Sequence, residues 1–302
     1  SKEERKKTKN KINFSSSVSK KEYLDSIKKI KDYIIEGDVM QVVYGQELTT
    51  PFEGSPVELY KALRKLNPSP YMYFLKIDDL HIVGASPEIL VRLQNNEVTV
   101  RPIAGTIKRG KNEKEDNELA STLKNDPKEI AEHLMLIDLG RNDIGKVCRP
   151  GSVVVSETMA VEKYAHVMHI ASNVQGQLQQ NLKAMDLLRA TLPVGTLSGA
   201  PKVRAMQIID ELEPEKRGVF GGAVGYLSWN GNMDTAIAIR TGIIKDQVLY
   251  VQAGAGVVAD SIAENEWQET INKARSIFHA ASFAETGLDI VDEPHTETGR
   301  DR

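Results

Sequence analysis

Residues 71–100 read YMYFLKIDDLHIVGASPEILVRLQNNEVTV, and this stretch decides the fold class. It contains four runs rich in aromatic and β-branched residues, YMYFLKI, HIVGA, ILVRL and EVTV, with only a few residues between one run and the next. Runs of this composition at close spacing are typical of consecutive strands. We therefore expect a β-meander here.

Helical periodicity lies on both sides of the meander. Ser19 and Glu22 fit a capping box, and apolar residues then recur at helical spacing as far as Ile34. Further helices are predicted at Pro56 to Leu66, at 113–138 with a break at Asp126-Pro127, at AMDLLRATL, at PKVRAMQIIDEL and from about Ala263 to Glu285. Further strands are predicted at Val39 to Tyr44, SVVV, HVMHIASNVQGQL, AVGYLSW, DTAIAIRTGII and QVLYVQAGAGVV. The pattern predicts α+β structure: a single large domain of mostly antiparallel sheets packed with helices.

Composition limits the class of protein. The 302 residues are 40% hydrophobic and 27% charged, a normal balance for a soluble globular domain. A net charge of -3 gives no reason to expect nucleic acid or an anionic membrane as a partner. The single cysteine, Cys148, excludes an intramolecular disulfide and indicates a reducing compartment. No apolar run approaches the roughly 20 residues that span a bilayer, so we expect a cytoplasmic protein.

The two ends differ from the middle of the chain. Residues 1–13 are basic and almost free of apolar side chains, as in a linker or the cut end of something longer, and residues 287–302 form a polar tail. We expect one folded domain over residues 14–286.

Two pairs of carboxylates have the same helical spacing. Glu129 and Glu132 are three residues apart on one predicted helix, and Glu266 and Glu269 repeat the spacing on the last one. If the two faces meet, four carboxylates repel one another unless a hard cation lies between them, and an oxygen-only ligand set suits Mg²⁺. The alternative is that each pair is simply a solvated helix face.

Basic and imidazole side chains add to these carboxylates. Arg240 closes the alternating run DTAIAIR, where it could bind a carboxylate or form a surface ion pair. Lys273 lies one helical turn after Glu269. His169, in YAHVMHIASNV, is either a packing residue or a general acid or base. From the residues alone we expect a Mg²⁺-dependent site for a small polycarboxylate.

Several long segments resemble the chorismate-utilising enzymes, and among these most closely the large subunit of anthranilate synthase. The segments are PIAGT, KEIAEHLMLIDLGRNDIGKV, VMHIASNVQGQL, PVGTLSGAPKVRAMQIIDELEP, RGVFGGAVGYLSW and QAGAGVVADSIAENEWQETINKA. Long motifs in the right order are far more specific than one short pattern. The resemblance covers about Lys20 to Glu285 and implies that residues 14–286 are a chorismate-binding catalytic domain.

The resemblance implies a role for each matching residue. Glu132 and Glu269 would be the Mg²⁺ ligands, with Glu129 and Glu266 beside them. The ring carboxylate of chorismate would meet the metal, Lys273 and the backbone N–H groups of a turn at Gly254, Ala255 and Gly256, and Arg240 would bind the enolpyruvyl carboxylate. Gly105, Thr106 and Thr196 match substrate-pocket positions, Glu88 matches the general acid for the C4 hydroxyl, and His169 matches the histidine tied to pyruvate elimination.

Two positions favour ammonia as the nucleophile. Isochorismate and salicylate synthases resemble one another in having a lysine base where this chain has Gln41, and aminodeoxychorismate synthases typically read PIKGT where it has Ala104. Neither residue activates water or attacks the ring. The resemblance therefore implies formation of anthranilate and pyruvate from chorismate and ammonia, with a glutamine amidotransferase as the native partner.

Departures from the family pattern keep alternatives open. Phe220 stands where tyrosine is usual, and the family's usual N-terminal part does not precede Ser1. Pro70, Tyr71 and Met72 resemble half of a tryptophan feedback site. The alternatives are a synthase that stops at 2-amino-2-deoxyisochorismate and a catalytically weak module that binds chorismate or tryptophan.

Overall fold

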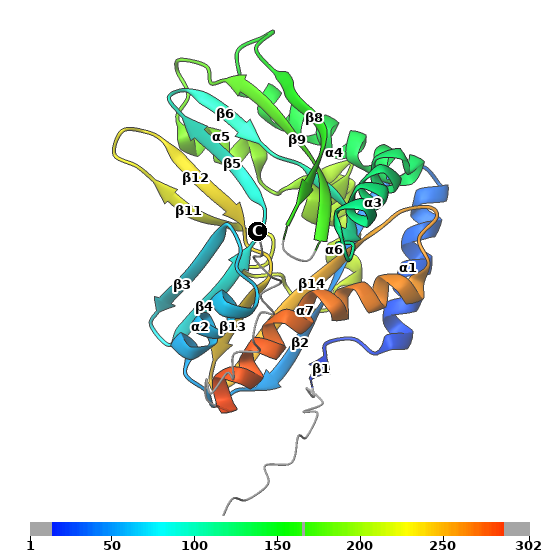
Figure 1. The fold of residues 1–302 in the computed structure, drawn as a ribbon, viewed down its shortest axis with the longest axis vertical. Coiled ribbons are helices and arrows are strands. Elements are labelled where there is room, and N and C mark those ends of the chain that lie inside the picture. The colour runs from blue at the N-terminus through cyan, green and yellow to red at the C-terminus, as the bar shows by residue number, and fades with distance from the viewer. Residues whose placement is uncertain (1–13, 165–166, 287–302) are drawn as a thin grey trace, which may run out of the picture.

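The computed structural model describes residues 14–164 and 167–286, and the predicted segments 1–13 and 287–302 lie outside this range. Its strands form two sheets of seven strands each, in which every pairing is antiparallel. Helices pack around both sheets (Figure 1). The structure thus confirms the α+β class with mostly antiparallel sheets.

The first sheet contains both early and late parts of the chain. Its strand order is β1 (Ser15–Ser16), β2 (Gln41–Pro51), β14 (Val248–Val257), β13 (Thr241–Lys245), β4 (Leu80–Ser86) and β3 (Tyr71–Ile77), with β10 (Gly199–Ala200) also paired to β2. Strand β2 begins within the predicted run and continues to Pro51, because β14 pairs with its whole length.

The second sheet holds the middle of the chain. Its order is β11 (Ala223–Leu227), β12 (Met233–Ile237), β5 (Ile89–Gln94), β6 (Glu97–Val100), β9 (Val167–Gln177) and β7 (Ile103–Lys108), with β8 (Val154–Lys163) on the other edge of β9. Strands β6 and β7 pair with successive parts of β9.

The predicted meander crosses from one sheet to the other. Its first two strands belong to the first sheet and its last two to the second, so the chain changes sheets between Ser86 and Ile89. The run DTAIAIRTGII, predicted as one strand that Arg240 closes, is also divided: β12 ends at Ile237 and β13 starts at Thr241. That prediction was wrong, because Arg240 has a left-handed backbone (φ 50°) and joins the two sheets.

The two crossings lie side by side. The N–H of Ala85 donates to the carbonyl of Arg240 (3.1 Å), and the N–H of Ile237 donates to the carbonyl of Glu88 (3.1 Å). Two residues predicted to handle the substrate, Glu88 and Arg240, are therefore brought together by the topology.

The helices of the described residues are α1 (Lys20–Ile35), α2 (Pro56–Leu66), α3 (Glu113–Asn125), α4 (Pro127–Gly145), α5 (Ala184–Thr191), α6 (Lys202–Leu212) and α7 (Ala263–Thr286), with a 3₁₀ turn η1 at Gly195–Leu197. The predicted capping box is present at Ser19. Asp126 caps α4 by accepting from the N–H groups of Lys128 and Glu129, which starts this helix just before its first carboxylate.

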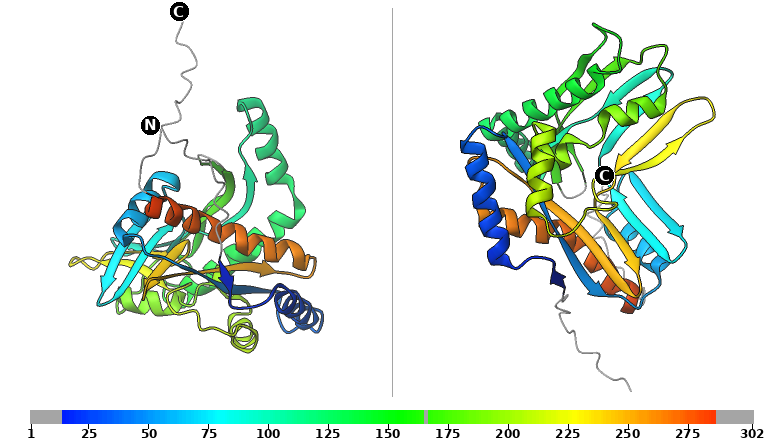
Figure 2. Two further views of the ribbon diagram at one scale, coloured as in Figure 1. Left: turned by 90° about the horizontal axis from the view of Figure 1, so that it is seen from below. Right: turned by 180° about the vertical axis from the view of Figure 1, so that it is seen from behind.

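Three apolar clusters hold the helices on the sheets. One joins α2 and α7 to the first sheet, one joins α4 and α5 to the second, and one joins α1 and α6 to β2 and β14. Helix α7 lies in front of the first sheet in Figure 1, whereas α6 is in front of it when the molecule is seen from behind in Figure 2. Across residues 14–164 and 167–286, none of the helices has the length and apolar character needed to cross a membrane.

Candidate active site

A bulge in β7 places the PIAGT motif. The pairing of β7 with β9 shifts between Ala104 and Ile107, and Gly105 has φ 64°, a conformation that favours glycine. A Cβ at Gly105 would lie 2.9 Å from Glu129 Oε2, so glycine also allows this carboxylate to approach the backbone. Thr106 follows in the same strand, and its side chain lies outside what the structure describes.

His169 is held on the other side of this bulge. Its Nδ1 lies 2.9 Å from the carbonyl oxygen of Gly105, and its ring makes an edge contact with Tyr164. Because a carbonyl only accepts, Nδ1 carries the hydrogen, and in the neutral ring Nε2 then has the lone pair. Gly105 therefore lies between a predicted metal ligand, Glu129, and the predicted catalytic histidine.

The four predicted metal ligands converge from α4 and α7. Burial raises the pKa of Glu132, and the negative charges of Glu129 and Glu269 raise it further. Burial and then the charge of Asp126 raise the pKa of Glu129, to which Glu269 adds a smaller effect. Burial raises the pKa of Glu266, which Ser261 lowers by a hydrogen bond and Glu269 raises. The charge of Glu269 thus reaches each of the other three carboxylates.

This convergence is not yet a closed coordination shell. Within the part of the chain that the structure describes, no group of three or more His, Cys, Asp or Glu side chains is arranged to hold a metal ion. Mg²⁺ is usually bound through one or two protein carboxylates together with water and substrate oxygens. The oxygen-only donor set and the mutual repulsion of the carboxylates fit such a cation.

Lys273 connects the carboxylates to the glycine-rich strand. Its Nζ lies 2.7 Å from Glu269 Oε1 and donates to the carbonyl of Gly254 at 2.8 Å. Its positive charge also lowers the pKa of Glu88. A single side chain of α7 therefore contacts a predicted metal ligand and the glycine-rich segment, and its charge acts on the predicted general acid.

The segment Gly254 to Gly256 lies within strand β14, which confirms the strand predicted at QVLYVQAGAGVV; the turn that the resemblance implied was wrong. The N–H groups of Gly254 and Gly256 nevertheless do not pair with β2. Opposite this segment on β2, the N–H of Gly45 donates to Glu213 and that of Val43 to Ser198, so these residues do not bond back to Gly254 and Gly256. The antiparallel pattern then directs the N–H groups of both glycines away from β2, beyond the end of β13, which pairs only with Val248–Val251.

Glu88 lies at the crossing between the sheets. Burial raises its pKa to about 7, while the Thr196 hydroxyl and the charge of Lys273 lower it. The buried Thr196 Oγ1 nevertheless finds no hydrogen-bond partner among the described residues. Beside it, burial lowers the pKa of Arg240, which the charge of Glu269 raises. The site thus combines an acid that is half protonated near neutrality with a desolvated guanidinium.

Sequence reasoning missed some of the residues that support the site. Ser261, just before α7, accepts the N–H of Val258 and bonds Glu266. His133, next to Glu132, is buried against Ser172. The Ser261 side chain closes the turn before α7, a contact that polar residues often make in turns, whereas the partner of His133 depends on strand pairing that no local pattern reveals.

The sequence model of a protein family described as "chorismate binding enzyme" matches residues 1–279 of this chain. The chain belongs to the chorismate-binding enzyme family. Anthranilate synthase component 1 of Pseudomonas aeruginosa is 60% identical over 276 residues, which cover 91% of this chain and 56% of the relative. The Aquifex aeolicus protein of the same name is 56% identical over 273 residues, covering 90% and 55%. The chain therefore spans about half the length of these curated relatives.

Solved structures of chorismate-binding enzymes agree with the fold. The crystal structure of anthranilate synthase component I from Streptococcus pneumoniae matches with a TM-score of 0.83 and 51% identity, covering 88% of this chain and 59% of that one. The menaquinone-specific isochorismate synthase MenF of Escherichia coli matches with a TM-score of 0.81 at 24% identity, which supports the fold alone.

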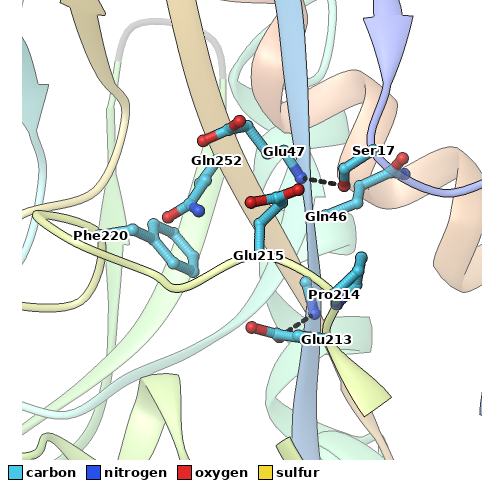
Figure 3. Close-up of a pocket in the computed structure, with 9 residues that line it drawn as sticks. Ser17, Gln46, Glu47, Glu213, Pro214, Glu215, Phe220 and Gln252 are labelled. Carbon is cyan, nitrogen blue, oxygen red and sulfur yellow. Dashed lines mark hydrogen bonds between the residues drawn. The ribbon is translucent and has the colours of Figure 1, made fainter. Parts of the chain in front are cut away.

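Two hollows of the described structure are lined by none of the four predicted metal ligands. Phe220 lines both: a narrow one with Gln252, Glu47 and Glu215 (Figure 3), and a cavity of about 250 Å³ against Leu197. The Arg217 guanidinium lies over the Phe220 ring. Phe220 therefore lines hollows that contain none of the other predicted substrate-binding residues, and its place in the substrate pocket stays a prediction.

The three residues that resemble a tryptophan site lie at the start of β3. Pro70 is exposed, and Met72 packs against the cluster under α2 and α7. The Tyr71 hydroxyl donates to Asp234 Oδ1 at 2.7 Å and accepts from Arg92 at 3.2 Å. Since Asp234 and Arg92 belong to the second sheet, Tyr71 joins the two sheets of this family member.

Proposed function

We propose that the chain is the catalytic part of an anthranilate synthase component 1. It would convert chorismate and ammonia into anthranilate, pyruvate and water in the cytoplasm, as a step of tryptophan biosynthesis. The observation that carries the proposal is the convergence of Glu88, Arg240 and Lys273 on the carboxylates of α4 and α7. Support also comes from relatives of this name that are 55–61% identical over about nine-tenths of the chain.

Glu132 and Glu269 would hold a Mg²⁺ ion, with Glu129 and Glu266 beside them. When bound, the ion supplies a positive charge that attracts and orients the ring carboxylate of chorismate. The carboxylate would also accept from Lys273 and from the N–H groups of Gly254 and Gly256. Arg240 would bind the enolpyruvyl carboxylate, with Gly105, Thr106, Ala255 and Phe220 completing the pocket.

In the first step ammonia forms a bond to C2 of chorismate and the C4 hydroxyl departs. Glu88, in its protonated form, would give the hydroxyl its proton so that it leaves as water. Thr196, next to the carboxyl, would help to place it. A pKa of about 7 keeps a large fraction of Glu88 protonated near neutrality, which this step requires.

In the second step C2 loses its proton, the bond to the enolpyruvyl oxygen breaks and the ring becomes aromatic as pyruvate leaves. His169 would act here. Its Nδ1–H is directed at the carbonyl of Gly105, so the lone pair of Nε2 is the basic site of the ring.

The identity of the nucleophile is proposed from two uncharged positions. Gln41 is buried on β2 near Gly256, and a Cβ at this glycine would lie 2.5 Å from Gln41 Nε2. An amide does not accept a proton near neutrality, so water has no activator there. Ala104 is buried in β7 and offers no amine. Ammonia needs neither a base at Gln41 nor an amine at Ala104, so it is the nucleophile that agrees with both residues. A glutamine amidotransferase partner or the solution would supply it.

Tryptophan regulation is proposed for the start of β3. Pro70, Tyr71 and Met72 would form part of a feedback site. Tyr71 is the member of this group best placed to affect the active site, since its hydroxyl reaches Asp234 on the other sheet.

The test is an assay of purified chain with chorismate, Mg²⁺ and an ammonium salt at alkaline pH. Fluorescent anthranilate should form, and mass analysis should find pyruvate in equal amount. Accumulation of 2-amino-2-deoxyisochorismate would assign only the first step to this chain. Binding of chorismate without any turnover would refute the catalytic proposal.

A further inference from the structure

Helix α4 carries Glu129 and Glu132, and its rotation decides where they point. Apolar side chains lie around much of this helix: Leu136 and Ile137 are buried, whereas Leu134 is 48% exposed. The buried residues His133, Leu136, Ile137 and Ile144 lie on one face, so packing sets which face of α4 is buried, but apolar contacts are not directional and leave small rotations less well defined. A carboxylate lies roughly 5–6 Å from the helix axis, so a turn of about 20° moves it by about 2 Å. Metal ligands tolerate only about 0.2 Å.

A directional contact lies next to the carboxylates. His133 directly follows Glu132, is fully buried, and places Nε2 2.7 Å from Ser172 Oγ of β9. Ser172 is also fully buried, and its Oγ accepts the N–H of Met159 in β8 at 2.8 Å. Its own N–H donates to the carbonyl of Pro102 at 3.2 Å, just before the PIAGT bulge. The contact thus ties α4 to the strands that carry His169 and Gly105.

Only one of the two ring nitrogens of His133 is hydrogen-bonded to a described residue. Its Nδ1 is buried and has no hydrogen-bond partner among the residues the structure describes. A buried polar atom without a partner costs about 1–3 kcal/mol. A leucine at this position would remove that cost but would leave the buried Ser172 hydroxyl without its His133 partner, at a similar cost, so the two effects on stability should roughly cancel.

We propose that His133 and Ser172 are positioning residues that set the rotation of α4 and so aim Glu129 and Glu132 at the divalent cation. The inference rests on the proposed function, since it requires these carboxylates to bind a metal. The two residues act through the carboxylates and have no contact with substrate in this role.

The experiment measures binding of Mn²⁺, as a paramagnetic substitute for Mg²⁺, to the full chain without substrate. Free Mn²⁺ is followed by electron paramagnetic resonance during a titration. Ser172→Ala and His133→Leu should each weaken binding by about tenfold, the usual loss when a residue that orients a metal ligand is removed. His133→Leu should do so without lowering the melting temperature. His133→Gln, which keeps an N–H group near the place of Nε2, should regain most of the affinity.

The matched control is Thr235→Val. The Thr235 hydroxyl is also buried and donates a bond of 2.7 Å to the carbonyl of Val91, but it lies in the second sheet without contact to the predicted ligands. Its loss should leave Mn²⁺ affinity unchanged. Wild-type affinity in both Ser172→Ala and His133→Leu would overturn the positioning role while leaving the proposed function intact. Absence of Mn²⁺ binding in the wild type would overturn the metal site and this role together.

Discussion

At the scale of single residues, Glu88 should shape the pH dependence of the reaction. Burial raises its pKa to about 7, and the proposed acid must be protonated. The rate per unit of free ammonia should therefore fall as the pH rises through about 7. Glu88→Gln should lower the rate by about 10²–10⁴-fold and abolish this descent. Initial rates on both sides of neutrality, divided by the free ammonia concentration, measure both effects.

Glu97→Gln is a suitable control for this prediction, because Glu97 is an exposed carboxylate on β6. It should keep the wild-type rate and profile. A descent near the same pH that survives in Glu88→Gln would show that another group is the acid.

Ala104→Lys tests whether the pocket depends on the absence of an amine. Ala104 is 7% exposed and adjoins the Gly105 bulge that touches Glu129. A lysine here competes with ammonia for the ring, so anthranilate formation should fall at least about tenfold, and mass spectrometry of the protein should detect a covalent adduct with the ring. Ala104→Met, similar in length but not nucleophilic, should give no adduct. Unchanged activity in the lysine variant would contradict the proposed nucleophile.

At the scale of elements, the contact of α7 with β14 should tune the acid on the other sheet. Lys273 bonds Glu269 and the carbonyl of Gly254, and its charge lowers the pKa of Glu88. Lys273→Met should therefore move the descent in the pH profile to higher pH, and the KM for chorismate should rise about tenfold because a carboxylate partner is lost. Arg275→Met on the same helix is the control. A raised KM with an unmoved profile would exclude the effect on Glu88.

The nearness of the α4 and α7 carboxylates should cost stability when no cation is present. Burial and the neighbouring carboxylates raise the pKa of Glu132 above its value in the unfolded chain. The folded state therefore binds more protons, and its stability falls as the pH rises through this raised pKa. Glu132→Gln should raise the melting temperature of the metal-free protein at alkaline pH by about 2 °C. It should also reduce the further rise that Mg²⁺ gives the wild type, and an equal Mg²⁺-induced rise in the variant would contradict the metal role of Glu132.

Local sequence patterns predicted the elements well, but they could not predict the sheet to which each strand belongs. The capping box at Ser19 and the boundary at Asp126-Pro127 depend on neighbouring residues, so both could be read from the chain. The break at Arg240 could not, because the alternation of DTAIAIRTGII continues through a residue whose φ of 50° is imposed by the two sheets. The spacing within each pair of glutamates predicted that its two members share a helix face, whereas the approach of the α4 carboxylates to those of α7 depends on tertiary packing.

At the scale of the whole molecule, the candidate site depends on how the two sheets meet. Glu88 and Arg240 lie where the chain crosses between them, while the carboxylates come from α4 on one sheet and α7 on the other. A small change in the angle between the sheets therefore alters the distance between the acid, the guanidinium and the metal ligands. Contacts that join the sheets away from the site should affect catalysis for this reason.

Tyr71 provides such a contact. Burial and Asp234 raise its pKa to about 12, so its hydroxyl stays protonated and donates to Asp234, which also accepts from Arg92 Nε at 3.0 Å. Tyr71→Phe should lower the free energy of unfolding by about 1 kcal/mol, or the melting temperature by about 2–4 °C. It should also reduce kcat/KM about threefold to tenfold, because the two sheets would no longer be held in the same relative position. Tyr33→Phe removes hydroxyl bonds of 3.1 Å from α1 to Glu211 of α6, within the half of the molecule built on the first sheet. It should lower the melting temperature without changing kcat/KM, and equal kinetic effects in the two variants would show that the contact between the sheets has no special role.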